Sequence, residues 1–216
     1  MKKIAARIIM LVLVFSIIVS LTSEMAVAYV PSGADIYYWY CDTNDVGYWS
    51  ISQIKTYVSS SVSMTSLSVS NIKTYLNTAF SKWNCTGRTI SYVNNISNAN
   101  LIVRGITRAT ANSYGYPSNV VGITIPTKQA VGQLYLNGVY TKTLYKITGA
   151  SVDIIYETTY TDTTSGAKKV IVHEIGHALG YLGHYNSGTV MTATYENITS
   201  ITPSTNENQH LSQIYN

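Results

Sequence analysis

Charged residues are scarce in this sequence. Its 14 Lys and Arg and 10 Asp and Glu make up 11% of 216 residues, and the net charge is +4. No basic run or stripe is present that could neutralise a phosphate backbone, so nothing indicates nucleic-acid binding. Four prolines and 14 glycines are too few for a collagen-like or linker composition, and a hydrophobic content of 46% is too high for a disordered chain. The composition therefore predicts a folded globular protein.

Long hydrophobic runs are also absent, apart from one near the N-terminus. Three basic residues precede the run Ile8–Leu21, and a small-x-small pattern ends at Ala28. The run is shorter than the roughly 20 residues of a membrane-spanning helix. We therefore predict a signal peptide over residues 1–28 and a single domain over residues 29–216, secreted to the extracellular space, monomeric and free of the membrane. An uncleaved N-terminal anchor is the alternative.

Cysteine occurs only twice, at Cys41 and Cys85. In an oxidising compartment two cysteines are expected to form a disulfide bond. The alternatives are two unpaired thiols, or Cys41 as a ligand that masks a metal.

The secondary-structure pattern is that of an α+β protein or a mixed sheet with helices on it. A helix with Ser70 as N-cap and an apolar stripe from Ile72 to Trp83 follows a serine-rich stretch, residues 57–70, that we expect to be a loop or an irregular edge. The two residues Asn137-Gly138 predict a hairpin turn, and Ser204 with Glu207 predicts the capping box of a closing helix. The expected strands are Arg88–Val93, Asn100–Ile106, Val120–Ile125, Gln133–Leu136 and Ser151–Glu157.

Three of the four histidines lie within twelve residues, in the segment AKKVIVHEIGHALGYLGH that begins at Ala167. His173 and His177 are four positions apart on a predicted helix, so both imidazoles reach the same side and can bind one ion. Zinc favours nitrogen ligands and leaves one position for water in catalytic sites. Glu174, beside the first ligand, can accept the proton of that water. An H-E-x-x-H pattern on a helix is typical of zinc peptidases.

The third ligand requires a break in the helix. His184 lies seven positions after His177, about 10 Å further along a continuous helix. Gly180 and Gly183 can end the helix and turn the chain back, which favours His184 as the third ligand. Glu196 is the competing third ligand, as in gluzincin-type peptidases, and His210 is interpreted as a surface histidine.

These residues resemble the signature of the metzincin zinc peptidases, and of the matrixin-like ones among them. His173, Glu174, His177 and Gly180 are in step with H-E-x-x-H-x-x-G-x-x-H, whereas the third histidine comes one position late, at His184. The segment ending at Met191 resembles the Met-turn, and Tyr195 occupies the aromatic position four residues later, although Ala193 replaces a proline. The resemblance covers residues 70–216, with its specific part in residues 173–195.

The resemblance implies an α+β, metzincin-like catalytic domain with a twisted mixed β-sheet, an active-site helix, a Met-turn and a C-terminal helix. It implies a zinc-dependent endopeptidase that hydrolyses protein or peptide substrates with a zinc-bound water activated by Glu174, and it places Tyr195 in the pocket for the residue after the scissile bond. The family's histidine-rich structural zinc segment is missing.

A structural calcium site is compatible with the family, but no calcium-loop pattern surrounds the aspartates, which we interpret as surface carboxylates: Asp42, Asp45, Asp153 and Asp162. A substrate-binding edge strand is expected at Val120–Ile125 or Gln133–Leu136. The alternative function is an exported, non-catalytic binding or adhesion module that keeps the fold and a metal.

Overall fold

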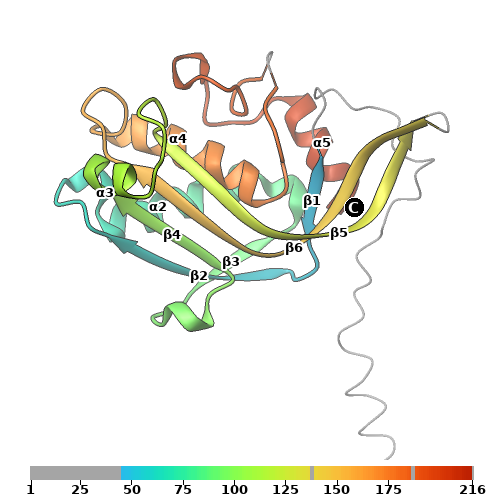
Figure 1. Cartoon of the computed structure of the whole chain (residues 1–216), viewed down its shortest axis with the longest axis horizontal. Coiled ribbons are helices and arrows are strands. Elements are labelled where there is room, and N and C mark those ends of the chain that lie inside the picture. Colours follow the sequence, from blue (N-terminus) through green and yellow to red (C-terminus); the bar gives the residue numbers. More distant parts are fainter. Residues whose placement is uncertain (1–44, 137–138, 186–187, 216) are drawn as a thin grey trace, which may run out of the picture.

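The six strands of the protein form one twisted mixed sheet (Figure 1). The computed structural model describes residues 45–136, 139–185 and 188–215. The strands are β1 (Val46–Trp49), β2 (Gln53–Ser60), β3 (Thr89–Tyr92), β4 (Leu101–Ile106), β5 (Gly122–Leu136) and β6 (Val139–Ile155). The order β1-β6-β4-β2-β3 is parallel throughout, and β5 is antiparallel to β6. The predicted mixed sheet is therefore confirmed.

Strands β5 and β6 form a long, twisted hairpin that extends beyond the rest of the sheet (Figure 1). Leu136 pairs with Val139, in agreement with the predicted two-residue connection, although Asn137 and Gly138 themselves lie outside the described residues. The expected strand Gln133–Leu136 and all but the first two residues of the expected strand Val120–Ile125 belong to the single strand β5 (Gly122–Leu136). Within the described residues β5 pairs only with β6, so its other edge is open.

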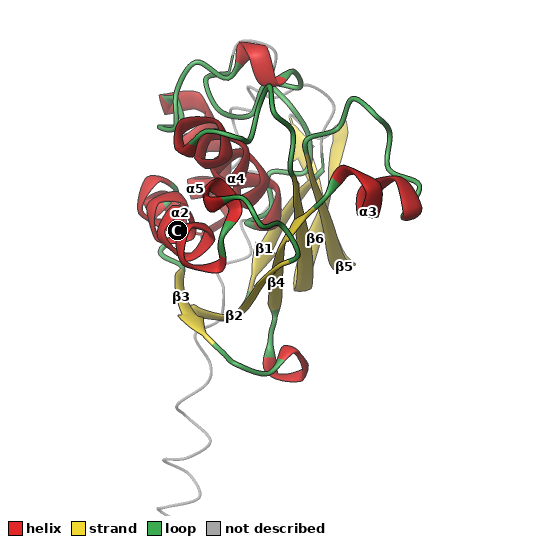
Figure 2. Cartoon of the chain, turned by 90° about the vertical axis from the view of Figure 1, so that its left-hand side faces the viewer, coloured by secondary structure: helices red, strands yellow, loops and turns green. Residues whose placement is uncertain are grey.

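Helices α2 (Val69–Lys82), α4 (Thr164–Ala178) and α5 (Thr205–Tyr215) lie on one side of the sheet, and the short α3 (Arg108–Ser113) lies on the other (Figure 2). Apolar side chains of α2, α4 and the central strands fill the space between these layers, among them Ile72, Leu76, Val103, Val152, Ile171 and Ile175. Burial of this apolar area fixes α4 against the sheet. In the described part of the chain, no helix has the length and apolar character needed to cross a membrane.

Residues 57–60 were expected to be a loop or an irregular edge, and this prediction was wrong: they belong to β2, which pairs with β3 on one side and β4 on the other. In β2 the side chains of Ile54, Thr56 and Val58 are buried and alternate with more exposed neighbours, as in a strand with one face on the core. The helix that follows begins two residues earlier than predicted, because its N-cap is Ser68 and not Ser70: the Ser68 hydroxyl accepts a hydrogen bond from the Asn71 amide.

Cys85 is half-buried and has no disulfide partner within the described part of the chain. Cys41 and the predicted signal peptide lie outside that part, so the Cys41–Cys85 disulfide stays a prediction.

Candidate metal centre

Helix α4 carries two of the three clustered histidines. It begins after Thr163, whose hydroxyl accepts a hydrogen bond of 3.1 Å from the Gly166 amide. This contact satisfies one of the free N–H groups at the helix start. Ile171 and Ile175 belong to the apolar core, whereas His173 and Glu174, which are also buried, line a cavity beside α4. The helix therefore presents its polar residues from a rigid, buried element.

The helix ends where the glycine pattern predicted. Gly180 has a φ of 115°, a conformation that residues with a side chain rarely adopt. The Gly180 amide donates to the His177 carbonyl (3.0 Å) and the Tyr181 amide to the Gly176 carbonyl (3.0 Å), which is a Schellman cap. The Gly47 amide also donates to the Gly180 carbonyl at 2.9 Å, so strand β1 holds the chain reversal in place.

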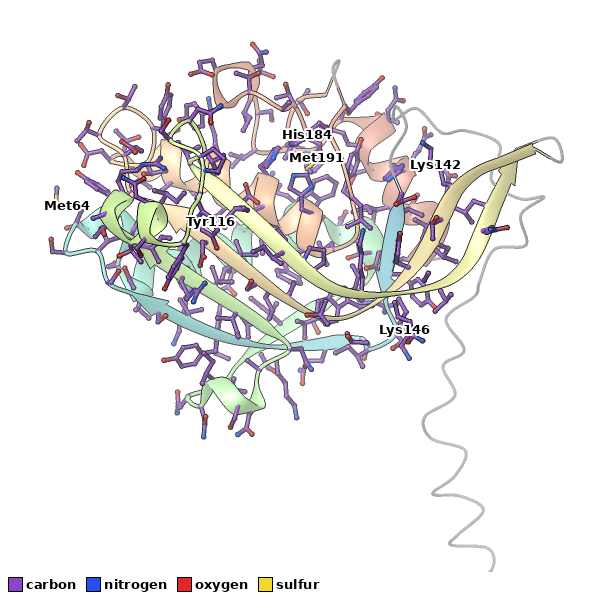
Figure 3. All side chains as sticks on the ribbon, viewed as in Figure 1. Met64, Tyr116, Lys142, Lys146, His184 and Met191 are labelled. Atoms are coloured by element: carbon purple, nitrogen blue, oxygen red, sulfur yellow. The ribbon has the colours of Figure 1, made fainter. Side chains whose placement is uncertain are left out.

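The chain then turns back and brings His184 to the other two histidines. The Gly183 amide donates to the Tyr181 carbonyl at 3.0 Å, and this three-residue turn takes up the extra residue before His184. One ring nitrogen from each of His173, His177 and His184 lies within 4.8 Å of the others. Glu196 is not a member of this group. Figure 3 shows His184 and Met191 together on the side of the sheet that carries α4.

Hydrogen bonds to backbone carbonyls fix the orientation of two rings. Nδ1 of His173 lies 2.7 Å from the Val190 carbonyl oxygen, and Nδ1 of His177 lies 2.6 Å from that of Tyr181. A carbonyl only accepts, so each Nδ1 carries the proton and each Nε2 keeps its lone pair. The two Nε2 atoms are 3.1 Å apart. Tetrahedral zinc with Zn–N bonds of 2.0–2.1 Å would separate them by about 3.3 Å, so the donor set fits zinc.

Burial keeps these imidazoles neutral, which is the form that binds metal. It lowers the pKa of His173 to about 4 and the pKa of His177 well below its ordinary value, and it also lowers the pKa of His184. Two facing lone pairs repel one another unless a cation lies between them. The three rings thus form a site that is suited to a divalent cation.

The side chain of Glu174 extends from α4 to strand β5, where it contacts Thr124 and Gly122. The Thr124 hydroxyl is 2.7 Å from Glu174 Oε2 and 2.9 Å from the Glu174 carbonyl oxygen. A Cβ atom at Gly122 would lie 2.5 Å from Glu174 Oε1, so the carboxylate occupies the space that the glycine leaves. Burial raises the pKa of Glu174 to about 7, and the Thr124 hydrogen bond opposes that shift. A carboxyl group with such a pKa is suited to accept and return a proton near neutral pH.

Met191 packs beneath the histidines. A Cβ atom at Gly176 would lie 2.5 Å from Met191 Sδ, so the thioether lies directly against α4. Oε1 of Glu207, at the start of α5, accepts hydrogen bonds from the amides of Thr189 (3.1 Å), Val190 (3.0 Å) and Met191 (2.6 Å). Glu207 therefore holds the turn whose Val190 carbonyl orients His173.

The capping box predicted for α5 is confirmed. The Ser204 amide donates to Glu207 Oε2 at 2.6 Å, and the Glu207 amide lies 3.3 Å from the Ser204 hydroxyl. The link from Glu207 to the Met-turn was missed, because a capping-box pattern gives no information about more distant partners. Gly122 and Thr124 were missed likewise, since an isolated glycine or threonine in a strand carries no specific signal.

His210 was predicted to lie on the surface, and this prediction is wrong. Its side chain is 1% exposed, and its ring centroid lies 4.4 Å from that of Tyr181. Burial, together with the charge of Lys142, lowers the pKa of His210 to about 3. The residue lies on the side of α5 that packs against the protein, four positions before Ile214, which is also buried.

A cavity of about 860 Å³ adjoins the histidines. Its lining includes Gly122–Thr124 at the start of β5, so the first of the two candidate edge segments faces the site. Tyr195 and Glu196 also line the cavity. The Tyr195 ring packs edge-to-face on Tyr160 with centroids 4.8 Å apart, and Glu196 accepts a hydrogen bond of 2.8 Å from the Tyr160 hydroxyl.

The aspartates considered for calcium have other partners. Asp153 is buried and paired with Arg104 through two bonds of 2.7 Å, and it accepts a hydrogen bond from Tyr116, so the prediction of a surface carboxylate was wrong for this residue. Asp45 accepts from the Thr143 amide and Asp162 from the Tyr156 hydroxyl. Asp42 lies outside the described residues.

The chain was compared with known proteins. No curated protein matches it. Among solved structures, the GM1-bound form of the ECX AB5 holotoxin shares 16% identity with a TM-score of 0.42, over 76% of this chain and 80% of that chain. The crystal structure of myroilysin shares 14% identity with a TM-score of 0.29, over 79% and 75%. The profile of the Matrixin family matches residues 48–216, which include every strand and helix from β2 onward, the three histidines and Glu174. The chain therefore belongs to the matrixin family.

Proposed function

We propose that this protein is a secreted zinc endopeptidase in which His173, His177 and His184 bind the metal and Glu174 is the general base. The observation that carries the proposal is the convergence of three imidazole nitrogens within 4.8 Å, beside a buried carboxyl group and an open strand edge. Membership of the matrixin family supports zinc and a protein substrate. The N-terminal apolar run supports secretion.

The metal, when bound, would polarise the scissile carbonyl and acidify a water molecule. The Glu174 carboxylate takes a proton from the attacking water and delivers it to the leaving amine, while Thr124 holds one of its oxygens. The open edge of β5 binds the substrate in an extended conformation through main-chain hydrogen bonds. Gly122 lets this strand approach Glu174, so that the bound peptide and the base lie close together.

Replacement of the base tests the mechanism. Glu174→Ala leaves the three imidazoles in place, so the variant is expected to bind one zinc per chain as the wild type does. Its kcat for a protein substrate should fall by roughly 10²–10⁴-fold, because general-base assistance is lost. Metal content and casein digestion, measured on both proteins, check this. Normal digestion by the variant would refute the assigned role of Glu174.

Chelation separates the peptidase from a non-catalytic binding module on the same fold. The wild type should digest casein, lose this activity with a chelator and regain it on addition of zinc. A protein that holds zinc but digests neither casein nor gelatin would support the binding module instead.

A further inference from the structure

The open edge of β5 has a definite set of main-chain groups beside the proposed base. Among the described residues β5 pairs only with β6, so its other edge has no partner strand. The Ile155 amide donates to the Val121 carbonyl at 2.9 Å, so Val121 faces β6. Main-chain groups point alternately to the two sides of a strand, so the N–H and C=O groups of Gly122 and Thr124 point to the open edge.

Pro126 continues this series, two positions after Thr124. It lies opposite Ala150 in the register, and the Ala150 amide donates to the Asn100 carbonyl on the other side of β6, at 2.9 Å. Pro126 and Ala150 therefore form a pair without mutual hydrogen bonds, and the main chain of Pro126 points to the open edge. Proline has no N–H, so at this position the edge offers a carbonyl group alone, and the ring occupies the place of the donor.

Pro126 belongs to the cavity beside the histidines. Between positions 124 and 127 the lining includes Thr124 and Pro126 but not Ile125 or Thr127, as in a strand whose side chains alternate between its two faces. The Thr124 hydroxyl lies 2.7 Å from Glu174 Oε2. Since two residues of a strand span about 7 Å, Pro126 lies at about this distance along the edge from the residue that contacts the base.

The strand also bends just after this proline. The pairing of β5 with β6 is regular up to Thr127 and shifts at Lys128, because Thr148 of β6 has no partner in the register. Such a bulge bends a strand pair and increases its twist. Figure 1 shows the strong curvature of the hairpin. A straight peptide bound along the start of β5 therefore diverges from the edge after Pro126.

From these observations we propose that Pro126 ends the substrate-binding edge of β5. A substrate that runs in either direction forms main-chain hydrogen bonds with Gly122 and Thr124, and its carbonyl group opposite Pro126 meets no donor. This inference rests on the proposed peptidase function and names its substrate class: segments with only a few extended residues beside the cleaved bond, such as an exposed loop of a folded protein. Pro126 is then a specificity-determining residue.

The length of the substrate tests the inference in the wild-type protein. Because Glu174 contacts both Gly122 and Thr124, the substrate residue opposite Pro126 lies about two to four residues from the cleaved bond. Fluorogenic peptides with two to six residues on each side of this bond cover that range. On the side that runs toward Pro126, kcat/KM should rise up to this position and then stay constant within about twofold.

Pro126→Ala restores the missing N–H group. Peptides that reach this position should gain about two- to tenfold in kcat/KM, the effect of one hydrogen bond, and shorter peptides should be cleaved as by the wild type. A change in stability or in metal binding would instead affect all lengths equally. Pro117→Ala is the matched control, because Pro117 is exposed and lies outside both β5 and the cavity lining, and its length profile should equal that of the wild type.

Identical length profiles in Pro126→Ala and the wild type would overturn the inference and leave the peptidase function intact. A wild-type profile that keeps rising beyond the fourth residue on both sides would also overturn it, and this result does not depend on the folding of the variant. If the wild type cleaves none of the peptides and behaves as Glu174→Ala does, the peptidase function fails and the inference fails with it.

Discussion

At the scale of single residues, the position of Glu174 depends on an atom that is missing from its neighbour. Gly122 has no side chain, and the space of its absent Cβ is filled by Glu174 Oε1 and by Val170, at 2.5 Å and 2.7 Å. Such distances are too short for real carbon contacts, so any larger residue must displace the carboxylate or the strand.

Gly122→Ala is therefore expected to lower kcat by about tenfold or more while the protein still binds one zinc, because a small displacement of a catalytic group is costly. Steady-state kinetics and metal content measure the two effects separately. Gly132→Ala, in the same strand, is the control: its new Cβ would lie 3.9 Å from the nearest atom, and it should keep wild-type kcat. Equal kcat in Gly122→Ala and Gly132→Ala would show that the close approach is unimportant.

At the scale of the elements, the cap of α4 determines where the third imidazole lies. Gly180 combines a positive φ with close contact to the Gly47 backbone, where a Cβ atom would overlap the Gly47 carbonyl oxygen. The chain reversal toward His184 therefore depends on this one glycine.

Gly180→Ala is expected to weaken zinc binding by at least tenfold, because the reversal must shift and move His184 away. Gly87→Ala is a matched control: Gly87 also has a positive φ, of 60°, but nothing lies within 4 Å of its Cβ position. This control should lose about 1 kcal/mol of stability and keep its zinc affinity. Competition with a chromophoric chelator measures the affinity, and a Gly180→Ala variant that binds zinc like Gly87→Ala would contradict this account.

The sequence predicted elements best where the pattern was local. The stripe of α2, the pair His173 and His177, and the capping box at Ser204 each depend on residues within four positions, and the structure contains all three. Strand β2 was missed because Ser59 and Ser60 hide its alternation of apolar and polar residues. The middle of β5 was missed because Pro126 and Gly132 interrupt the strand-like pattern of its sequence. The contacts of Thr124 with Glu174 and of Glu207 with Met191 are long-range, and no spacing rule reports them.

At the scale of the whole molecule, the buried His210 links folding to pH. Its pKa is about 3 in the folded protein, compared with an ordinary value of 6.5. Between these values the unfolded chain binds a proton that the folded chain excludes, so folding stability falls as the pH falls through this range.

His210→Phe should remove this part of the acid sensitivity. Between pH 7.5 and pH 5 the wild type should lose about 1–2 kcal/mol more unfolding free energy than the variant, since one pKa unit corresponds to about 1.4 kcal/mol. Urea unfolding at both pH values, with a chelator present in both proteins, provides the comparison. His173 and His177 contribute equally to the pH dependence of both proteins, so their contributions cancel when the two losses of unfolding free energy are compared. Identical losses would indicate that His210 takes up its proton without unfolding.

The carboxylate that begins α5 has a consequence for the order of events during synthesis. The amides of Val190 and Met191, in the turn beneath the histidines, donate hydrogen bonds to Glu207. Glu207 follows His184 by more than twenty residues in the sequence. A ribosome-bound chain that has exposed His184 still lacks this anchor, and so it cannot yet shape a working centre. For the peptidase proposed above, this order is expected to keep the growing chain inactive until α5 has been synthesised.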